Sequence, residues 1–369
     1  MIKPRHPFLL LILFCLLGIL IFLSIQRNKV EESSTYAIHS LLPYGKFSIS
    51  QIDAKENELI KEYSVNKPYD LISCFNNRFL LLSLTKNDSL LKSRIDLLDL
   101  KTGSYRKFAS SPNQNFSSVF TFKNKIYAFI GGNDSSALFL HVYDKKGKLL
   151  KILLIDYAAM LNNNAFFIFG NDLWILSNQF HNKETEDAPF IYVIDLNTLQ
   201  TKKVINLSKF FSGGMSMIFN QEDQEIYIAG LGNHPGVNRD INTYIHVFSF
   251  PDVKFKRKIN VSDQPTKLIY LPNYHKLYAR VGNTLKVIDV TQNKILKTFD
   301  LNINYLSEKS GFLYLSTIKY YFKKEGPTEV LKDVETKLLV LDTKTDEIIK
   351  KFIGDYGPVL QNIPIFKKE

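Results

Sequence analysis

The chain has 369 residues and a formal net charge of +11 at pH 7, with 45% hydrophobic, 13% aromatic and 22% charged residues. This balance is typical of a folded globular chain and excludes an intrinsically disordered one. The 28 Phe and 19 Tyr residues favour the pleated, half-buried surfaces of β-sheets. Two cysteines, Cys15 and Cys74, exclude a disulfide framework.

The first predicted element is the uncharged apolar segment 8–25, which follows the basic residues Lys3 and Arg5. Its 18 residues can cross a bilayer core as a helix. A small-x-small cleavage site is not apparent after the segment, and Leu13-Phe14 before Cys15 form a poor lipoprotein signal. These features favour an uncleaved signal anchor, with a cleaved signal peptide as the alternative.

The anchor divides the chain into a short basic N-terminus at 1–7, the transmembrane helix at 8–25, a polar tether at 26–40 and one large domain at 41–369. Basic residues before the anchor favour a cytoplasmic N-terminus. Arg27 and Lys29 on the far side reduce the charge difference on which this orientation rests. We therefore expect a single-pass protein of the cell membrane whose domain lies on the extracytoplasmic side.

The domain contains a recurring hairpin, in which an alternating apolar strand ends in Asp and is followed by a polar turn and a Lys-rich strand. Period-two alternation predicts antiparallel strands, and Asp side chains accept hydrogen bonds from turn N–H groups two residues on. The copies lie at 49–64, 95–108, 140–153, 191–204, 245–259, 285–299 and 338–352. Their turn residues are Asp53, Asp99, Asp144, Asp195, Ser249, Asp289 and Asp342.

Two further strands precede most of these hairpins and complete units of about 40–50 residues, which is the period of propeller blades. Complete units lie at 68–108, 117–156, 163–208, 213–262, 264–300 and 304–353. The hairpin at 47–64 lacks its upstream strands, and the tail at 357–366 lacks a hairpin. Pairing these ends removes exposed strand edges. The prediction is an all-β, seven-bladed β-propeller preceded by a single N-terminal transmembrane helix.

The hairpins at 287–299 (VIDVTQNKILKTF) and 340–352 (VLDTKTDEIIKKF) share an Asp at the end of the first strand, a Thr two or three residues further on, and then a second strand. This pattern resembles the YVTN-type and quinoprotein-like seven-bladed β-propeller superfamily over residues 45–366, and the resemblance implies architecture only. A β-helix and a two-sheet sandwich are the structural alternatives, which the uneven spacing disfavours. Larger superfamily members that hold a quinone cofactor use repeated tryptophans, whereas Trp174 is the single tryptophan here. We therefore expect no cofactor.

The longest insertions, 179–188, 231–242 and 319–337, all follow the second strand of their unit and should share one face of the domain. Function tends to lie on irregular loops held by a rigid scaffold, although propeller loops also lengthen without function. The candidate binding-face residues are His181, Glu184, Glu186, Asp187, Asn233, His234, Arg239, Asp240, Lys323 and Lys324. The histidines and acids among them have no recognised metal-ligand spacing, so a metal site is left open.

No nucleophile-elbow, metalloprotease or phosphate-loop motif occurs in the chain. The sequence favours a membrane-anchored, extracytoplasmic binding or scaffolding propeller that engages a protein or an anionic envelope polymer. The alternative is an extracytoplasmic hydrolase or lyase with its active site at the propeller channel mouth. Basic residues are not interleaved with aromatic ones, so nucleic acid is not an expected partner. The sequence leaves the oligomeric state open.

Overall fold

The structure is a computed structural model. It describes residues 34–41, 46–53, 56–65, 69, 71–76, 78–84, 93–111, 114–132, 137–156, 159–179, 188–232, 242–325, 328–353, 355–359 and 365–366, some of them as backbone only. Strands dominate this part of the chain, and the only helix within it is the short 3-10 helix η1 (Pro272–Tyr274). The described residues include no helix that is long and apolar enough to cross a membrane. The predicted anchor at 8–25 lies outside them.

Six sheets each contain four antiparallel strands that are consecutive in the sequence. The first three contain β4 (Leu71–Asn76), β5 (Phe79–Leu84), β6 (Ser93–Asp99) and β7 (Tyr105–Ser111); β8 (Gln114–Phe122), β9 (Lys125–Gly132), β10 (Leu138–Tyr143) and β11 (Leu149–Asp156); and β12 (Ala159–Phe169), β13 (Asp172–Gln179), β14 (Ala188–Asp195) and β15 (Gln200–Asn206). The other three contain β16 (Gly214–Asn220), β17 (Glu225–Gly230), β18 (Tyr244–Ser249) and β19 (Phe255–Asn260); β20 (Pro265–Leu271), β21 (Lys276–Val281), β22 (Thr284–Asp289) and β23 (Lys294–Asp300); and β24 (Ile303–Lys309), β25 (Phe312–Glu325), β26 (Thr328–Asp342) and β27 (Glu347–Ile353).

A further sheet combines strands from both ends of the chain in the order β28 (Asp355–Val359), β1 (Ser34–Leu41), β2 (Lys46–Asp53) and β3 (Leu59–Val65). We call it the composite sheet. Its β1 and β28 are antiparallel. The strand β1 begins inside the segment predicted as a polar tether, because its Thr, Tyr and Ile residues favour extended backbone despite the neighbouring serines.

The C-terminal tail divides between two sheets. After β28 has joined the composite sheet, β29 (Ile365–Phe366) pairs in parallel with the end of β12. Ile168 aligns with Ile365 and Phe169 with Phe366. The tail at 357–366, predicted to hold one or two strands, is therefore two short strands, and only the first pairs with β1.

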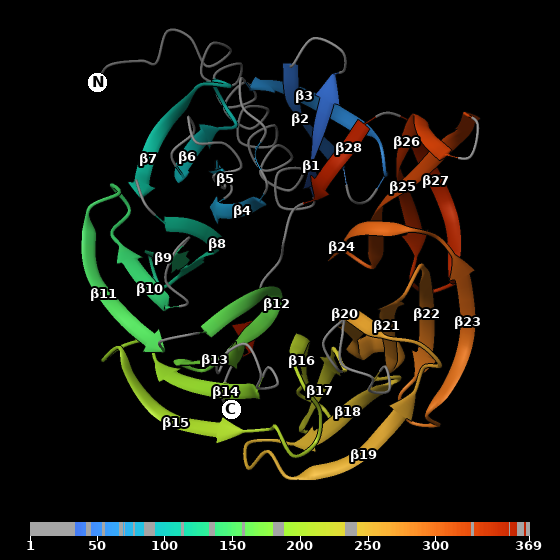
Figure 1. The fold of residues 1–369 in the computed structure, drawn as a ribbon. Coiled ribbons are helices and arrows are strands. Elements are labelled where there is room, and N and C mark those ends of the chain that lie inside the picture. Colours follow the sequence, from blue (N-terminus) through green and yellow to red (C-terminus); the bar gives the residue numbers. More distant parts are fainter. Residues whose placement is uncertain are drawn as a thin grey trace, which may run out of the picture.

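The sheets surround a central axis like the blades of a propeller, with β4, β8, β12, β16, β20 and β24 innermost (Figure 1). This arrangement confirms the predicted propeller fold. One side of the ring, the turn face, carries the short turns at 100–104, 144–148, 196–199 and 290–293. The opposite side, the loop face, carries the connections at 133–137, 180–187, 231–243 and 282–283. Ser34 pairs with Asp53, just before a turn of the turn face, so the described chain begins on that face.

Hydrophobic side chains fill the spaces between neighbouring sheets, and the composite sheet packs on both sides. Ile49 and Tyr63 lie in one buried cluster with Leu80 of the β4–β7 sheet. Ile52 lies in another cluster with Tyr314 of the β24–β27 sheet. Burial of these apolar side chains stabilises the junctions on either side of the composite sheet.

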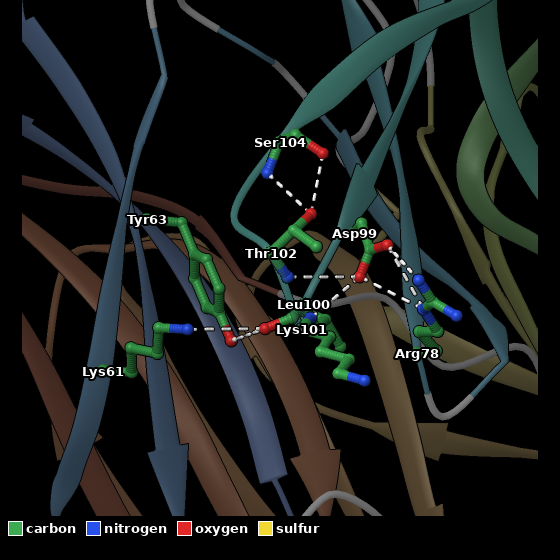
Figure 2. Close-up of polar contacts among 8 residues, drawn as sticks. All are labelled: Lys61, Tyr63, Arg78, Asp99, Leu100, Lys101, Thr102 and Ser104. Atoms are coloured by element: carbon green, nitrogen blue, oxygen red, sulfur yellow. Dashed lines mark hydrogen bonds and ion pairs between the residues drawn. The ribbon is translucent and has the colours of Figure 1, made fainter.

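Polar contacts between sheets reinforce this packing at the turn face (Figure 2). The Tyr63 hydroxyl of β3 donates to the Leu100 carbonyl oxygen at 3.0 Å, and the Lys61 ammonium donates to the same oxygen at 3.4 Å. In this turn, Asp99 accepts a hydrogen bond from the backbone N–H of Lys101 at 2.9 Å. The same capping bond, two residues on, is made by Asp144, Asp195, Asp289 and Asp342, which confirms the predicted turn chemistry.

Replacing Tyr314 with Phe should lower the free energy of unfolding by about 1–2 kcal/mol, because the buried Asn57 side chain loses its donor. The Tyr314 hydroxyl donates to Asn57 Oδ1 at 3.0 Å, and this bond joins the β24–β27 sheet to the composite sheet. Urea unfolding of the full-length chain measures the change. Tyr321→Phe is the matched control, since its hydroxyl donates to Glu335 at an exposed site. Equal effects of the two substitutions would show that the Asn57 bond contributes no special stability.

Candidate functional site

Eight of the ten predicted binding-face residues lie outside the described residues. His181, Glu184, Glu186 and Asp187 belong to the connection between β13 and β14, and Asn233, His234, Arg239 and Asp240 belong to that between β17 and β18. Both connections leave their sheets at the loop face, because each joins a second strand to a third. Whether these eight side chains converge stays a prediction.

The third predicted loop, 319–337, is largely regular structure. The strands β25 and β26 extend to 14 and 15 residues and pair along this segment. Lys323 pairs with Val330 and Lys324 with Glu329, so these two lysines lie on a long hairpin rather than on an irregular loop. Aromatic and β-branched residues in this segment favour the extended backbone.

The two ends of the 231–242 insertion meet beside a buried histidine of β18. The His246 ring lies 4.8 Å from the Phe211 ring, and neither of its nitrogens makes a hydrogen bond of normal geometry. Burial and the nearby Lys258 charge lower the pKa of His246 to about 4, so the ring is neutral at physiological pH. Ser212 Oγ and Asn242 Nδ2 are also buried without partners.

Two cations, Lys267 and Arg280, lie side by side on the inner strands of the β20–β23 sheet. Lys267 is directly opposite Arg280 in the antiparallel register of β20 and β21. A register shift occurs between Pro265 and Lys267, which indicates a β-bulge at Thr266. Such a bulge redirects the side chains that follow it. The pair lies near the loop face, where β21 and β22 are joined by the two-residue turn 282–283.

Both cations lie on the side of their sheet that faces the β24–β27 sheet. Lys267 alternates along β20 with Ile269, and Arg280 is opposite Leu285 of β22. Leu285 belongs to the buried cluster that contains Leu313, and Ile269 packs against that cluster. Because side chains two residues apart in a strand share one side, the two cations lie above this apolar layer.

Neither cation has an ion-pair partner within the part of the chain that the structure describes. Burial, followed by the neighbouring Arg280 charge, lowers the pKa of Lys267 to about 7. Burial also lowers the pKa of Arg280, whose Nε is buried without a hydrogen-bond partner. The cost of removing these charges from water is therefore not offset by a carboxylate.

Two carboxylates of this region, Glu335 and Asp263, form no ion pair with either cation. Glu335 lies on β26 and bonds to Lys337 at 2.6 Å. It also accepts a hydrogen bond from the Tyr321 hydroxyl at 2.9 Å. Asp263 lies beside Gly282 with an exposed side chain. The region around Lys267 and Arg280 thus keeps an excess of positive charge.

Equivalent positions in other sheets show that the propeller fold does not require cations here. Lys267 and Arg280 form the fifth residue pair from the turn that joins the first two strands of their sheet. The fifth pairs of three other sheets are Ser216 with Ala229, Ser118 with Phe129, and Tyr305 with Ser316. Uncharged side chains fill these places. The cation pair is therefore a specific feature of the β20–β23 sheet.

Two adjacent, poorly solvated cations can bind a phosphate or carboxylate group, because an anion supplies the missing counter-charge. Metal binding is not indicated for the described residues, which contain no suitable group of three His, Cys, Asp or Glu side chains. This pair was not among the site residues predicted from the sequence. A signal was present, since both KLYARVG and PTKLIYL place a cation inside an otherwise apolar strand of the same unit.

The ring of four-stranded sheets, with its loop face and turn face, defines the chain as a β-propeller protein. It is similar in fold to the hydrazine synthase of Kuenenia stuttgartiensis, with a TM-score of 0.56, 9% sequence identity and coverage of 73% of this chain and 86% of the other. A functionally unknown protein from Desulfotomaculum acetoxidans DSM 771 is similar with a TM-score of 0.55 and 11% sequence identity. The match covers 90% of this chain and 100% of that protein. The dihydro-heme d1 dehydrogenase NirN, solved in complex with DHE, is similar with a TM-score of 0.54 and 11% sequence identity. The match covers 89% of this chain and 75% of that protein.

These likenesses show the fold alone, because the sequence identities are so low. No family model matches the chain, and no curated protein matches it in sequence.

Proposed function

We propose that the chain is a membrane-anchored, extracytoplasmic binding propeller that engages an anionic polymer of the cell envelope through its loop face. The observation that carries this proposal is the pair of Lys267 and Arg280, which are opposite each other and lack a counter-charge among the described residues. An acidic group of the polymer would supply that charge. The formal net charge of +11 favours the approach of such a polyanion over long distances.

The position of the first described strand supports an orientation for the propeller. The apolar segment 8–25 is the proposed anchor, and β1 begins at the turn face. A chain that enters at the turn face leaves the loop face directed away from the membrane. The predicted binding-face loops and the cation pair are then both available to a polymer of the envelope.

We also propose that the composite sheet serves as the seventh blade and closes the ring. Its contacts support this role, because it packs against the β4–β7 sheet on one side and the β24–β27 sheet on the other. The hydrogen bonds Tyr63–Leu100 and Tyr314–Asn57 lie at the same two junctions. A closed ring holds the loop face rigid, which lowers the entropy cost of binding a ligand there.

Inorganic polyphosphate is a suitable probe for the proposed anion site, with poly-L-glutamate as a carboxylate counterpart. Binding is measured on the full-length chain in detergent micelles by isothermal titration calorimetry at a pH of about 6, where Lys267 is charged because its pKa is about 7. The variant carrying both Lys267→Met and Arg280→Gln should bind polyphosphate about 100-fold more weakly, at roughly 1.4 kcal/mol for each lost charged contact. The affinity of the unchanged chain should fall as salt concentration rises.

Lys286→Met is the matched control. Its ammonium donates to the Val261 carbonyl oxygen, on the other side of the same sheet, so polyphosphate binding should change by less than about threefold. Equal affinity of the double variant and the unchanged chain would refute the proposed site. If neither polymer binds, but crosslinking in intact cells captures a protein only when the pair is present, the partner is an acidic protein instead.

A further inference from the structure

We propose that Lys267 is a nucleophilic amine that condenses with the carbonyl group of small anionic oxo compounds, whose negative charge Arg280 binds. This inference rests on the proposed function in one respect, since it uses the same cation pair as an anion site. It goes further in assigning a covalent reaction to one of the two residues. The chemical class of the reactant is an aldehyde or ketone that carries a phosphate or carboxylate group.

The register of β20 and β21 supplies the geometry. Directly opposed residues of an antiparallel pair have Cβ atoms about 5 Å apart, so Lys267 and Arg280 can contact one small molecule together. The apolar layer formed by Ile269 and Leu285 lies beneath them. An anion bound to the Arg280 guanidinium would therefore place a neighbouring carbonyl carbon within reach of the Lys267 nitrogen.

The protonation state of Lys267 permits the attack. Burial and the Arg280 charge lower its pKa to about 7, whereas an ordinary lysine has a pKa of 10.5. At a pH of about 7.5 most Lys267 amines are neutral, and only about one ordinary lysine in a thousand is. A neutral lysine amine beside another cation is an established arrangement for Schiff-base chemistry. By contrast, Lys286 and Lys337 are already bonded to oxygen atoms.

The reaction is balanced without an oxidant or reductant. The Lys267 nitrogen lone pair attacks the carbonyl carbon, and the carbonyl oxygen takes a proton to give a carbinolamine. The second amine proton and the hydroxyl group then leave as water, and a carbon–nitrogen double bond forms. One amine and one carbonyl compound thus become one imine and one water molecule, and the reaction is reversible.

Pyridoxal 5′-phosphate is a direct probe, because it carries both an aldehyde and a phosphate. The full-length chain in detergent is incubated with the probe at a pH of about 7.5, the imine is reduced with borohydride, and labelled lysines are located by peptide mass spectrometry. Lys267 should be labelled at least about tenfold faster than Lys286, which serves as the internal reference. Labelling of Lys267 at or below the rate of Lys286 would overturn the proposal.

The role of Arg280 is tested by comparing pyridoxal 5′-phosphate with pyridoxal, which lacks the phosphate. Arg280→Gln should slow labelling of Lys267 by pyridoxal 5′-phosphate about tenfold and labelling by pyridoxal less than about twofold. A variant that slows both probes equally would contradict anion binding by Arg280. Far-UV circular dichroism and thermal unfolding confirm that the variant is folded.

The two proposals fail in different ways. If both hold, polyphosphate should protect Lys267 from the probe. Fast labelling without protection would overturn polymer binding at this pair and leave the reactive amine in place. In the opposite case, polyphosphate binding depends on Lys267 and Arg280, but Lys267 is not labelled preferentially. That result would support the proposed function and overturn the covalent reaction.

Discussion

Replacing Glu225 with Gln should lower the free energy of unfolding by about 3 kcal/mol, because a buried charge cluster then loses its only acid. Glu225 is 3% exposed. Its carboxylate accepts two hydrogen bonds from Arg257, at 2.5 and 2.9 Å, and one from the Tyr227 hydroxyl at 2.8 Å. Lys256 lies 2.5 Å from the same carboxylate. Without the negative charge, two cations repel each other beside a buried amide.

The cluster also joins two neighbouring sheets, so its loss should affect more than one blade. Arg257 of β19 donates to Asn293 Oδ1 at 3.1 Å and to the Val290 carbonyl oxygen at 3.3 Å, both in a turn of the β20–β23 sheet. Urea unfolding of the full-length chain measures the cost. Asp252→Asn, which removes an exposed ion pair with Lys254, is the matched control and should cost less than about 0.5 kcal/mol.

The Glu225 contribution should also depend on pH. Burial acts to raise the pKa of Glu225, but hydrogen bonds from Arg257, Lys256 and Tyr227 outweigh burial and lower the pKa below its ordinary value of 4.5. The stabilisation is therefore complete above pH 4.5 and is lost as the pH falls through the lowered pKa. An acid-unfolding midpoint that Glu225→Gln leaves unchanged would contradict this assignment.

Lys267→Met should increase the free energy of unfolding at neutral pH, by an amount on the order of 4 kcal/mol. The folded chain holds this lysine at a pKa of about 7, whereas the unfolded chain holds it at 10.5. Between these values the unfolded state binds one more proton, so stability rises by about 1.4 kcal/mol per pH unit. Below pH 7 both states are protonated, and the destabilisation is complete.

The groups that face Lys267 set the size of this effect. Arg280 is opposite it on its own sheet, and Thr317, Lys319, Lys337 and Glu335 follow the apolar layer on the facing sheet. Their net charge is positive, so they do not stabilise the charged amine.

Guanidinium unfolding at several pH values between about 7 and 10 compares Lys267→Met with the unchanged chain and with Lys286→Met. The stability difference should shrink as the pH rises toward 10.5. A difference that does not vary with pH would mean that Lys267 keeps an ordinary pKa.

Much of the fold could be predicted from local patterns. Alternating apolar residues and turn aspartates such as Asp289 and Asp342 act within one hairpin, and the structure confirms the bonds that they make. The pairing of β1 with β28 could not be assigned this way, because the two strands lie more than 300 residues apart. Local propensity carries no information about a partner so distant in the chain.

The candidate site was harder to predict for a similar reason. Lys267 and Arg280 are unusual because a neighbouring sheet half-buries them, and that sheet follows later in the sequence. The bulge at Thr266 decides which side Lys267 faces, and no residue type marks it. The length of the 319–337 insertion predicted an irregular loop, whereas β25 and β26 continue through this segment as paired strands. The loop residues around His181 and His234 remain predictions.

The pairing of β1 with β28 sets the order in which this protein can be completed during synthesis. The strand β1 is synthesised before β2 to β27, whereas its edge partner β28 follows all of them. Until then one edge of the nascent sheet is unpaired, and such edges promote misassembly with other chains. We therefore expect a chain truncated between β27 and β28 to be aggregation-prone, although it retains every strand from β1 to β27.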